Sequence, residues 1–399
     1  MFENINSLPA DPILGLNSVF NQDRHPDKIN LTVGVYQDSN GATPIFSAVK
    51  KAERSLLSEQ ESKAYLHQSG SAKFVKHIPS LLLGDDLVQQ LDARLETVMT
   101  PGGSGALHLG AKLVSMSSRS ARIWVSDPTW GNHYPLLQSS GLHVETYSYY
   151  DAELKGVNFA RMMESLSQIP EGDAVLLHGC CHNPTGADLT KPQCDELIEL
   201  MSKRNLLPFI DIAYQGFGKG LEEDAYLTRL AARTLPEVII ASSCSKSFGV
   251  YRERVGAISI ITENEKQTAA AQTHVFSAAR CSYSMPPYHG GGTIGRLLDD
   301  ENLKLEWQTE LEKIRCEMIE TRSELSKGLN AAQNKVDFSF LNNSSGMFCY
   351  LGISREQVLK LRSEYGIYLL ENGRINVAGI SKKNLPVMID RMSRVIGLT

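Results

Sequence analysis

The feature that most constrains the fold is a regular alternation of short apolar runs with amphipathic segments through the middle of the chain. Strand-like runs are predicted at 122–126, 143–149, 174–178, 208–212, 238–242 and 255–261, with helices at 191–204 and 227–234. Strands that alternate with helices over roughly 200 residues predict an α/β fold, in which helices cover both faces of a mostly parallel sheet. Ligands bind to such sheets at the carboxyl ends of the strands.

The two ends of the chain follow different patterns. From about Asn302 a long polar helix pattern runs to about Ala332, followed by two short strand-like runs and helices at 354–364 and 381–395. We therefore predict an N-terminal arm with part of a small domain at 1–45, a large domain at 46–300 and a small α+β domain at 301–399. The apolar patch Asp11-Pro12-Ile13-Leu14 is expected to pack on another domain or subunit, which favours an oligomer.

Charge and composition exclude several classes of protein. The net charge of −5 and the absence of basic runs argue against a nucleic-acid partner. The seven cysteines form no paired metal-binding spacing, so no metal site is expected and the thiols are predicted to be reduced. No segment reaches the roughly 18 to 20 apolar residues of a membrane span, and the N-terminus lacks the pattern of a signal peptide. A cytoplasmic protein without a membrane partner is expected.

The most informative motif is Ser243-Cys244-Ser245-Lys246-Ser247-Phe248-Gly249, which follows a predicted strand and precedes Arg254. A phosphorylated aldehyde cofactor needs an amine whose pKa neighbouring cations can lower, together with hydroxyl and guanidinium donors for its phosphate. By itself, a lysine in such a position would more often be an exposed turn residue.

Two further motifs fit the same cofactor. Asp211 ends an apolar strand, where a charge needs a cationic partner such as a protonated pyridine nitrogen, although a helix N-cap is the commoner role. The turn Thr100-Pro101-Gly102-Gly103-Ser104-Gly105 opens a helix whose free amides can hold a phosphate, although such turns are often only structural.

These motifs, in this order, resemble the class I, fold-type I aminotransferases, and the resemblance runs from Asp11 to Gly379. It is strongest toward the bacterial aspartate and aromatic amino-acid enzymes. The resemblance implies pyridoxal phosphate as cofactor, and a large domain with a mostly parallel seven-stranded sheet between helices beside a smaller α+β domain. It also implies a homodimer with active sites shared between subunits, acting on amino acids and 2-oxo acids.

The resemblance further implies a role for each site residue. Lys246 would be the Schiff-base lysine that passes protons, Asp211 would pair with the ring nitrogen and Tyr214 would donate to the phenolic oxygen. The cofactor-binding residues would be these three with Gly103, Ser104, Trp130, Asn183, Ser243, Ser245, Arg254 and, from the neighbouring subunit, Tyr65. His133 would orient Asp211. The substrate-binding residues would be Gly34, Trp130, Asn183, Arg374 for the α-carboxylate and, from the partner subunit, Arg280 for a distal carboxylate.

The expected reaction is a ping-pong transfer of an amino group from an aromatic amino acid, from aspartate, or from both, to 2-oxoglutarate. Arg280 favours dicarboxylates. Met285 and Ala64 stand where aspartate enzymes carry polar residues, and both favour aromatic substrates. A strict aspartate aminotransferase is the alternative.

Two other classes fit the sequence less well. A lyase or decarboxylase on the same fold would not explain Arg280. A binding module of a transcription regulator would be expected to carry a DNA-binding segment ahead of Asp11, and none is apparent.

Overall fold

The computed structural model of the chain describes residues 2–7, 14–117, 121–332 and 336–396. It divides into two compact units, one formed by Pro44–Glu317 and the other by Met1–Thr43 with Met318–Thr399. The long helix α13 (Glu301–Ala331) is continuous and contributes residues to both units. The sequence predicts domain boundaries after residues 45 and 300, and that division stays a prediction.

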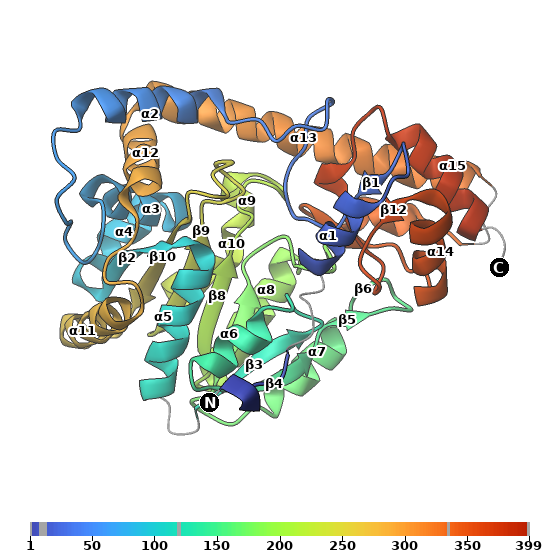
Figure 1. Ribbon diagram of the computed structural model, residues 1–399. Helices are drawn as coiled ribbons and strands as arrows, with labels where there is room; N and C mark the ends of the chain where they lie inside the picture. The colour runs from blue at the N-terminus through green and yellow to red at the C-terminus, as the bar shows by residue number, and fades with distance from the viewer. Residues whose placement is uncertain (1, 8–13, 118–120, 333–335, 397–399) are drawn as a thin grey trace. The chain divides into compact units, whose positions relative to one another are not determined.

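A seven-stranded sheet forms the centre of the larger unit, as Figure 1 shows. The strand β10 is antiparallel to both of its neighbours, β2 and β9, and the pairs from β9 to β4 are parallel. The mostly parallel seven-stranded α/β fold is thereby confirmed. The strands, in spatial order, are β2 (Leu95–Pro101), β10 (Val255–Ile261), β9 (Val238–Ser243), β8 (Leu207–Ile212), β7 (Ala174–His178), β3 (Arg122–Asp127) and β4 (His143–Ser148).

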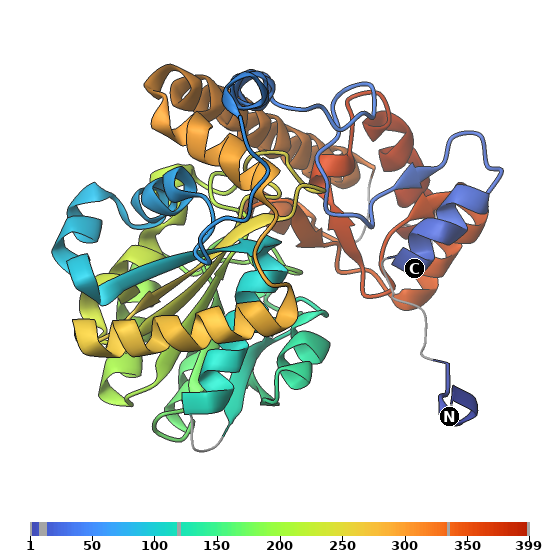
Figure 2. The same cartoon turned by 60° about the vertical axis from the view of Figure 1, so that its left-hand side comes forward.

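Helices pack on both faces of this sheet. The helix α5 (Gly102–Ser117) lies on one face together with α6 (His133–Ser139) and α11 (Glu265–Ser282), and Figure 2 brings the gold-coloured α11 to the front. At Gly110 of α5 a Cβ atom would lie 2.4 Å from Cζ of Phe209, so glycine allows this close approach of helix and sheet. The helices α3 (Ala72–Leu83), α10 (Tyr226–Thr234) and α12 (Tyr288–Asp299) pack on the other face.

Local signals account for the helix boundaries. The helix α8 (Lys191–Lys203) begins at a capping box, in which the Thr190 hydroxyl accepts from the Gln193 amide and the Gln193 side chain accepts from the Thr190 amide. The helix α8 agrees with the predicted helix at 191–204. The remaining elements of this unit are α2 (Ser47–Glu59), α4 (Asp85–Leu91), β5 (Tyr150–Asp151), β6 (Gly156–Val157), α7 (Phe159–Ser167), α9 (Leu221–Asp224) and a 3-10 helix at Asp92–Arg94.

The smaller unit joins the two ends of the chain. Strand β1 (Ile29–Asn30) pairs in parallel with β12 (Ile367–Tyr368), and β11 (Phe348–Tyr350) pairs antiparallel with β13 (Arg374–Asn376). The predicted terminal helices are α14 (Arg355–Tyr365) and α15 (Leu385–Ile396). The helix α1 (Leu14–Gln22) and three 3-10 helices, Phe2–Asn4, Ser339–Asn343 and Val377–Gly379, complete the unit.

Residues 11–13 of the apolar patch lie outside the described residues, so its packing stays a prediction. Within the described ranges, no helix combines the length and the apolar character that a membrane crossing requires.

Candidate active site

The candidate site lies at one edge of the sheet, in the larger unit. Strands β2, β3, β7, β8 and β9 run in the same direction, so their carboxyl ends meet there, and β10 begins there directly after Arg254. This edge gathers the predicted residues Gly103, Ser104, Trp130, His133, Asn183, Asp211, Tyr214, Ser243, Ser245, Lys246 and Arg254.

Lys246 follows β9 in a turn that leaves its amine partly buried. The Nζ atom lies 4.8 Å from the ring centroid of Tyr214 and makes no hydrogen bond to any residue that the structure describes. Burial lowers the pKa of the Lys246 amine to about 8. The carboxylate of Asp211 raises this pKa, and the positive charge of Arg254 lowers it. About a tenth of the amine is therefore unprotonated at pH 7, a far larger fraction than for a lysine of ordinary pKa.

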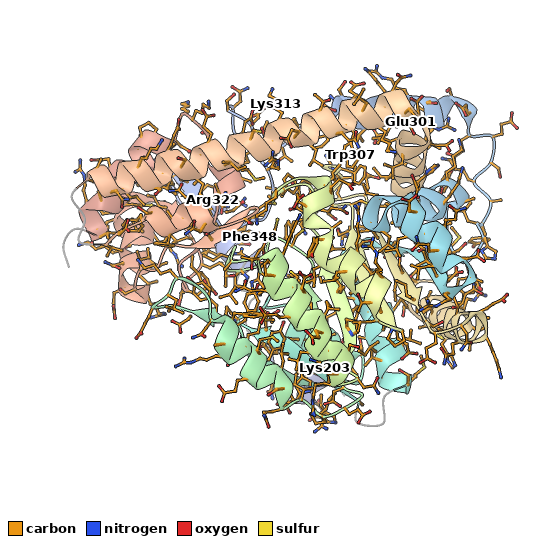
Figure 3. All side chains as sticks on the ribbon, turned by 180° about the vertical axis from the view of Figure 1, so that it is seen from behind. Lys203, Glu301, Trp307, Lys313, Arg322 and Phe348 are labelled. Atoms are coloured by element: carbon orange, nitrogen blue, oxygen red, sulfur yellow. The ribbon has the colours of Figure 1, made fainter. Side chains whose placement is uncertain are left out.

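The turn that carries Lys246 is held in place by buried contacts from two other segments. The Ser247 hydroxyl donates to the backbone oxygen of Gln215 at 2.7 Å. Trp307, which projects from α13 (Figure 3), donates from Nε1 to the backbone oxygen of Ser247 at 2.8 Å. Its ring stacks on Phe248 with centroids 4.3 Å apart. Trp307 was not among the predicted site residues, because nothing local in the sequence links it to a turn 60 positions earlier.

Asp211 is buried beside His133. The carboxylate Oδ2 lies 3.1 Å from His133 Nε2, and the other ring nitrogen, Nδ1, lies 2.7 Å from the Thr129 hydroxyl. Burial alone would raise the pKa of Asp211, but the hydrogen bond from His133 and the charges of His133 and Lys246 hold that pKa below its ordinary value. The carboxylate therefore stays negative at neutral pH.

His178 lies beside Asp211 and His133, and it was not among the predicted site residues. It pairs with Asp211 across the β7–β8 ladder, and its ring centroid lies 5.3 Å from that of His133. Burial lowers the pKa of His178 to about 3, so the ring is neutral. Both ring nitrogens are buried and lack a hydrogen-bond partner among the described residues. Its position as the last residue of a predicted strand was the available signal.

A second part of the site suits an anion. The guanidinium of Arg254 approaches the Ser245 hydroxyl at 3.3 Å. Gly102 has φ of 72°, and a Cβ atom there would lie 2.4 Å from Arg254 Nη2. A Cβ atom at Gly103 would lie 3.0 Å from Cβ of Ser243. Glycines thus let the amino end of α5, two hydroxyls and a guanidinium come close together, an arrangement that binds phosphate.

Three more predicted residues line the edge between these two parts. The Asn183 Nδ2 atom lies 3.5 Å from the Tyr214 hydroxyl, and both side chains are buried. Trp130 follows β3, and its ring meets that of His133 edge to face with centroids 5.2 Å apart. The side chains of Asn183 and Tyr214 can therefore act together on one polar atom.

Two predicted site residues of the larger unit, Tyr65 and Arg280, take no part in the contacts among the described residues at this edge of the sheet. Tyr65 is 91% exposed on the segment between α2 and α3. Arg280 is exposed in the last turn of α11. Neither forms a hydrogen bond or ion pair with another site residue in the described part of the chain.

Gly34 and Arg374 belong to the other compact unit. Arg374 is buried, donates from Nη2 to the Thr32 backbone oxygen at 2.5 Å and lies with its guanidinium carbon 4.3 Å from the Phe348 ring centroid. A Cβ atom at Gly34 would lie 2.7 Å from Cζ of Phe348. The structure therefore groups these two residues around one phenyl ring, which Figure 3 labels.

The arrangement at the sheet edge agrees with the comparisons with known proteins. Residues 26–392 match the family described as aminotransferase class I and II. This chain belongs to that family. It is 42% identical over 396 residues to the aspartate aminotransferase of Haemophilus influenzae, covering 99% of this chain and all of that protein. It is 43% identical over 388 residues to the aromatic-amino-acid aminotransferase of Paracoccus denitrificans, covering 97% and 98%.

A solved structure with a bound cofactor is also similar. The aromatic-amino-acid aminotransferase of Burkholderia pseudomallei, covalently bound to pyridoxal phosphate, superimposes with a TM-score of 0.96, 41% identity and 99% coverage of both chains. The cofactor of this aminotransferase is pyridoxal phosphate.

The side chains fit that group. Among described residues the Asp211 carboxylate has a hydrogen bond to His133 alone, through Oδ2, which leaves Oδ1 for a protonated ring nitrogen. The Lys246 amine, to which no described residue hydrogen-bonds, suits the aldehyde, and the Arg254 anion site suits the phosphate.

Proposed function

We propose that this aminotransferase moves the amino group of an aromatic amino acid, and of aspartate, to 2-oxoglutarate in a ping-pong cycle, with Lys246, Asp211 and Tyr214 as its catalytic residues. The observation that carries the proposal is the partly buried Lys246 amine, whose pKa is lowered to about 8, beside the buried carboxylate of Asp211. A general base is most effective when its pKa lies near the working pH.

The bound cofactor supplies an aldehyde that exchanges amino groups and a ring that accepts electrons when the substrate Cα loses its proton. The chain supplies the proton transfer and the positioning. Lys246 Nζ would take the proton from the substrate Cα and deliver it to the former aldehyde carbon, on the other side of the substrate nitrogen. Asp211 keeps the ring nitrogen protonated by its negative charge, and His133 holds that carboxylate in place. Gly103, Ser104, Ser243, Ser245 and Arg254 hold the phosphate.

The proposal of two substrate classes rests on relatives of both kinds and on the residues that differ from the aspartate enzymes. Relatives of similar identity are named aspartate and aromatic-amino-acid aminotransferases. Arg280 can pair with a distal carboxylate, and Arg374 with the α-carboxylate that every substrate carries. Met285 and Ala64 favour aromatic rings. A strict aspartate aminotransferase is the second candidate, supported by relatives such as that of Haemophilus influenzae.

A homodimer is part of the proposal, because Tyr65 and Arg280 are exposed and need a partner subunit to reach a site. We also propose a cytoplasmic location, in keeping with the predicted reduced thiols.

Arg280→Ala tests the substrate assignment. Because only a dicarboxylate offers a second negative charge, kcat/KM for aspartate should fall by about a hundredfold or more, whereas kcat/KM for phenylalanine should change less than about threefold. The matched control is Lys266→Ala, which removes an exposed positive charge from the same helix. Equal losses with both substrates would refute the role of Arg280, and a wild-type enzyme inactive toward phenylalanine and tyrosine would favour the strict aspartate enzyme.

A further inference from the structure

We propose that the chain, when free of its cofactor, binds one divalent first-row transition metal ion through His133, His178 and Asp211. Neither the family nor the proposed reaction calls for a metal. The ion would lie beside Asp211, whose carboxylate also faces the cofactor ring. Because the positive ion and the protonated ring nitrogen would repel each other across one carboxylate, ion and cofactor would compete.

The donor atoms of the three side chains already converge. One ring nitrogen from each histidine and a carboxylate oxygen of Asp211 all lie within 4.8 Å of one another, and His133 Nε2 is 3.1 Å from Asp211 Oδ2. Ligands bound to one zinc ion at about 2.0 to 2.2 Å lie roughly 3 to 4 Å apart. Small rotations of the side chains would therefore complete the site.

Rigid elements hold these donors. His133 is the first residue of α6, and His178 and Asp211 are cross-strand neighbours at the ends of β7 and β8 in the middle of the sheet. A site built on strands and a helix costs little ordering when an ion binds.

His178 provides the observation that points to a ligand. A buried polar atom without a hydrogen bond is costly, and both ring nitrogens of His178 are in that condition within the described part of the chain. An imidazole binds a metal ion through an unprotonated ring nitrogen, and a ring nitrogen of His178 lies within 4.8 Å of the donor atoms of His133 and Asp211. A metal ion would therefore bind a ring nitrogen that no described residue hydrogen-bonds.

His133 can serve as a ligand without losing its other hydrogen bond. A metal on Nε2 requires the ring proton on Nδ1, which lies 2.7 Å from the Thr129 hydroxyl. Because a hydroxyl both donates and accepts, it can accept from Nδ1 when the ring proton moves there. Metal-binding histidines commonly donate their second ring nitrogen in this way.

The donor set selects the kind of ion. Two imidazoles and one carboxylate suit Zn²⁺, Fe²⁺, Co²⁺ or Ni²⁺ with water in the remaining positions, whereas Mg²⁺ and Ca²⁺ prefer oxygen ligands only. A second convergent group, Cys180, Cys181 and Asp224, is a weaker candidate. Its carboxylate already accepts three backbone N–H groups between residues 216 and 219. The hydrogen bond with Cys180, together with burial, raises the pKa of the Cys181 thiol.

Titration of the full-length, cofactor-free chain with Co²⁺ tests the proposal, read by the visible absorption of the bound ion. One ion per chain should bind, and His178→Leu should weaken binding more than a hundredfold. Thr129→Val should weaken it by about tenfold to a hundredfold, since it removes only the partner of a ligand. The matched control, His143→Leu, removes an exposed histidine on β4 and should leave binding unchanged.

A comparison without any substitution guards against variants that fail to fold. Wild-type enzyme loaded with pyridoxal phosphate should bind no Co²⁺ at this site, and Zn²⁺ should slow reloading of the cofactor-free chain. Absence of binding by the cofactor-free chain, or equal binding by the loaded enzyme or by a folded His178→Leu variant, would overturn the proposal. Transamination by the loaded enzyme in a chelator solution is independent of these results, so the two proposals can fail separately.

Discussion

The closest backbone approach in the site is at Gly256, and it yields a sharp prediction for Gly256→Ala. A Cβ atom there would lie 2.5 Å from the carbonyl carbon of Gly102, 2.6 Å from the backbone oxygen of Ser242 and 2.8 Å from the Gly102 oxygen. All three atoms are backbone and cannot rotate away. Overpacking of this kind costs about 1 to 3 kcal/mol, so we expect the free energy of unfolding to fall by about 3 kcal/mol.

The same substitution should weaken cofactor binding, because relief of the contact moves the Gly102 turn that opens α5. If about half of the strain, about 1.4 kcal/mol, appears in binding, the Kd for pyridoxal phosphate rises about tenfold. Urea unfolding and cofactor titration measure the two effects. Gly131→Ala is the matched control, since no described residue other than its chain neighbours lies within 4 Å of the added Cβ atom. If Gly256→Ala behaves like Gly131→Ala, the packing argument is wrong.

Two further predictions concern Lys246 and its supporting turn. Trp307→Phe removes the hydrogen bond to the Ser247 backbone oxygen and should lower the free energy of unfolding by about 2 to 3 kcal/mol, measured by urea unfolding. An unchanged urea concentration at half-unfolding would show that Trp307 does not stabilise the turn. The Lys246 amine attacks the aldehyde only when it is unprotonated. The rate at which the cofactor-free chain takes up pyridoxal phosphate should therefore rise with pH around a midpoint near pH 8. Asp211→Asn should lower that midpoint, because the carboxylate of Asp211 raises the pKa of Lys246. A midpoint near the ordinary lysine value of 10.5 would exclude this assignment.

Much of the fold could be predicted because its signals are local. The strands β7, β8, β9 and β10 are mostly apolar and almost wholly buried, and α8 and α14 begin at capping boxes. Strand β2 was missed because Thr and Glu interrupt its apolar residues and its ends are only partly buried. The reversed direction of β10 was also not predicted, because a period-two pattern is the same in both directions.

The site was predicted where its residues follow strands in recognisable motifs, as Lys246, Asp211 and Asn183 do. Trp307 and His178 escaped prediction for different reasons. Trp307 reaches the site from a helix far along the chain, and only the folded structure brings its indole to the Ser247 carbonyl. His178 carries no motif of its own, and its importance comes from a strand pairing with Asp211.

Reduction of the enzyme loaded with pyridoxal phosphate by sodium borohydride, followed by peptide mass mapping, tests the central claim most directly. The reagent makes a carbon–nitrogen bond between cofactor and lysine permanent. We expect the added mass on the peptide that contains Lys246 and on no other lysine. A cofactor fixed to a different lysine, or none fixed while the enzyme is fully active, would contradict the assignment of Lys246.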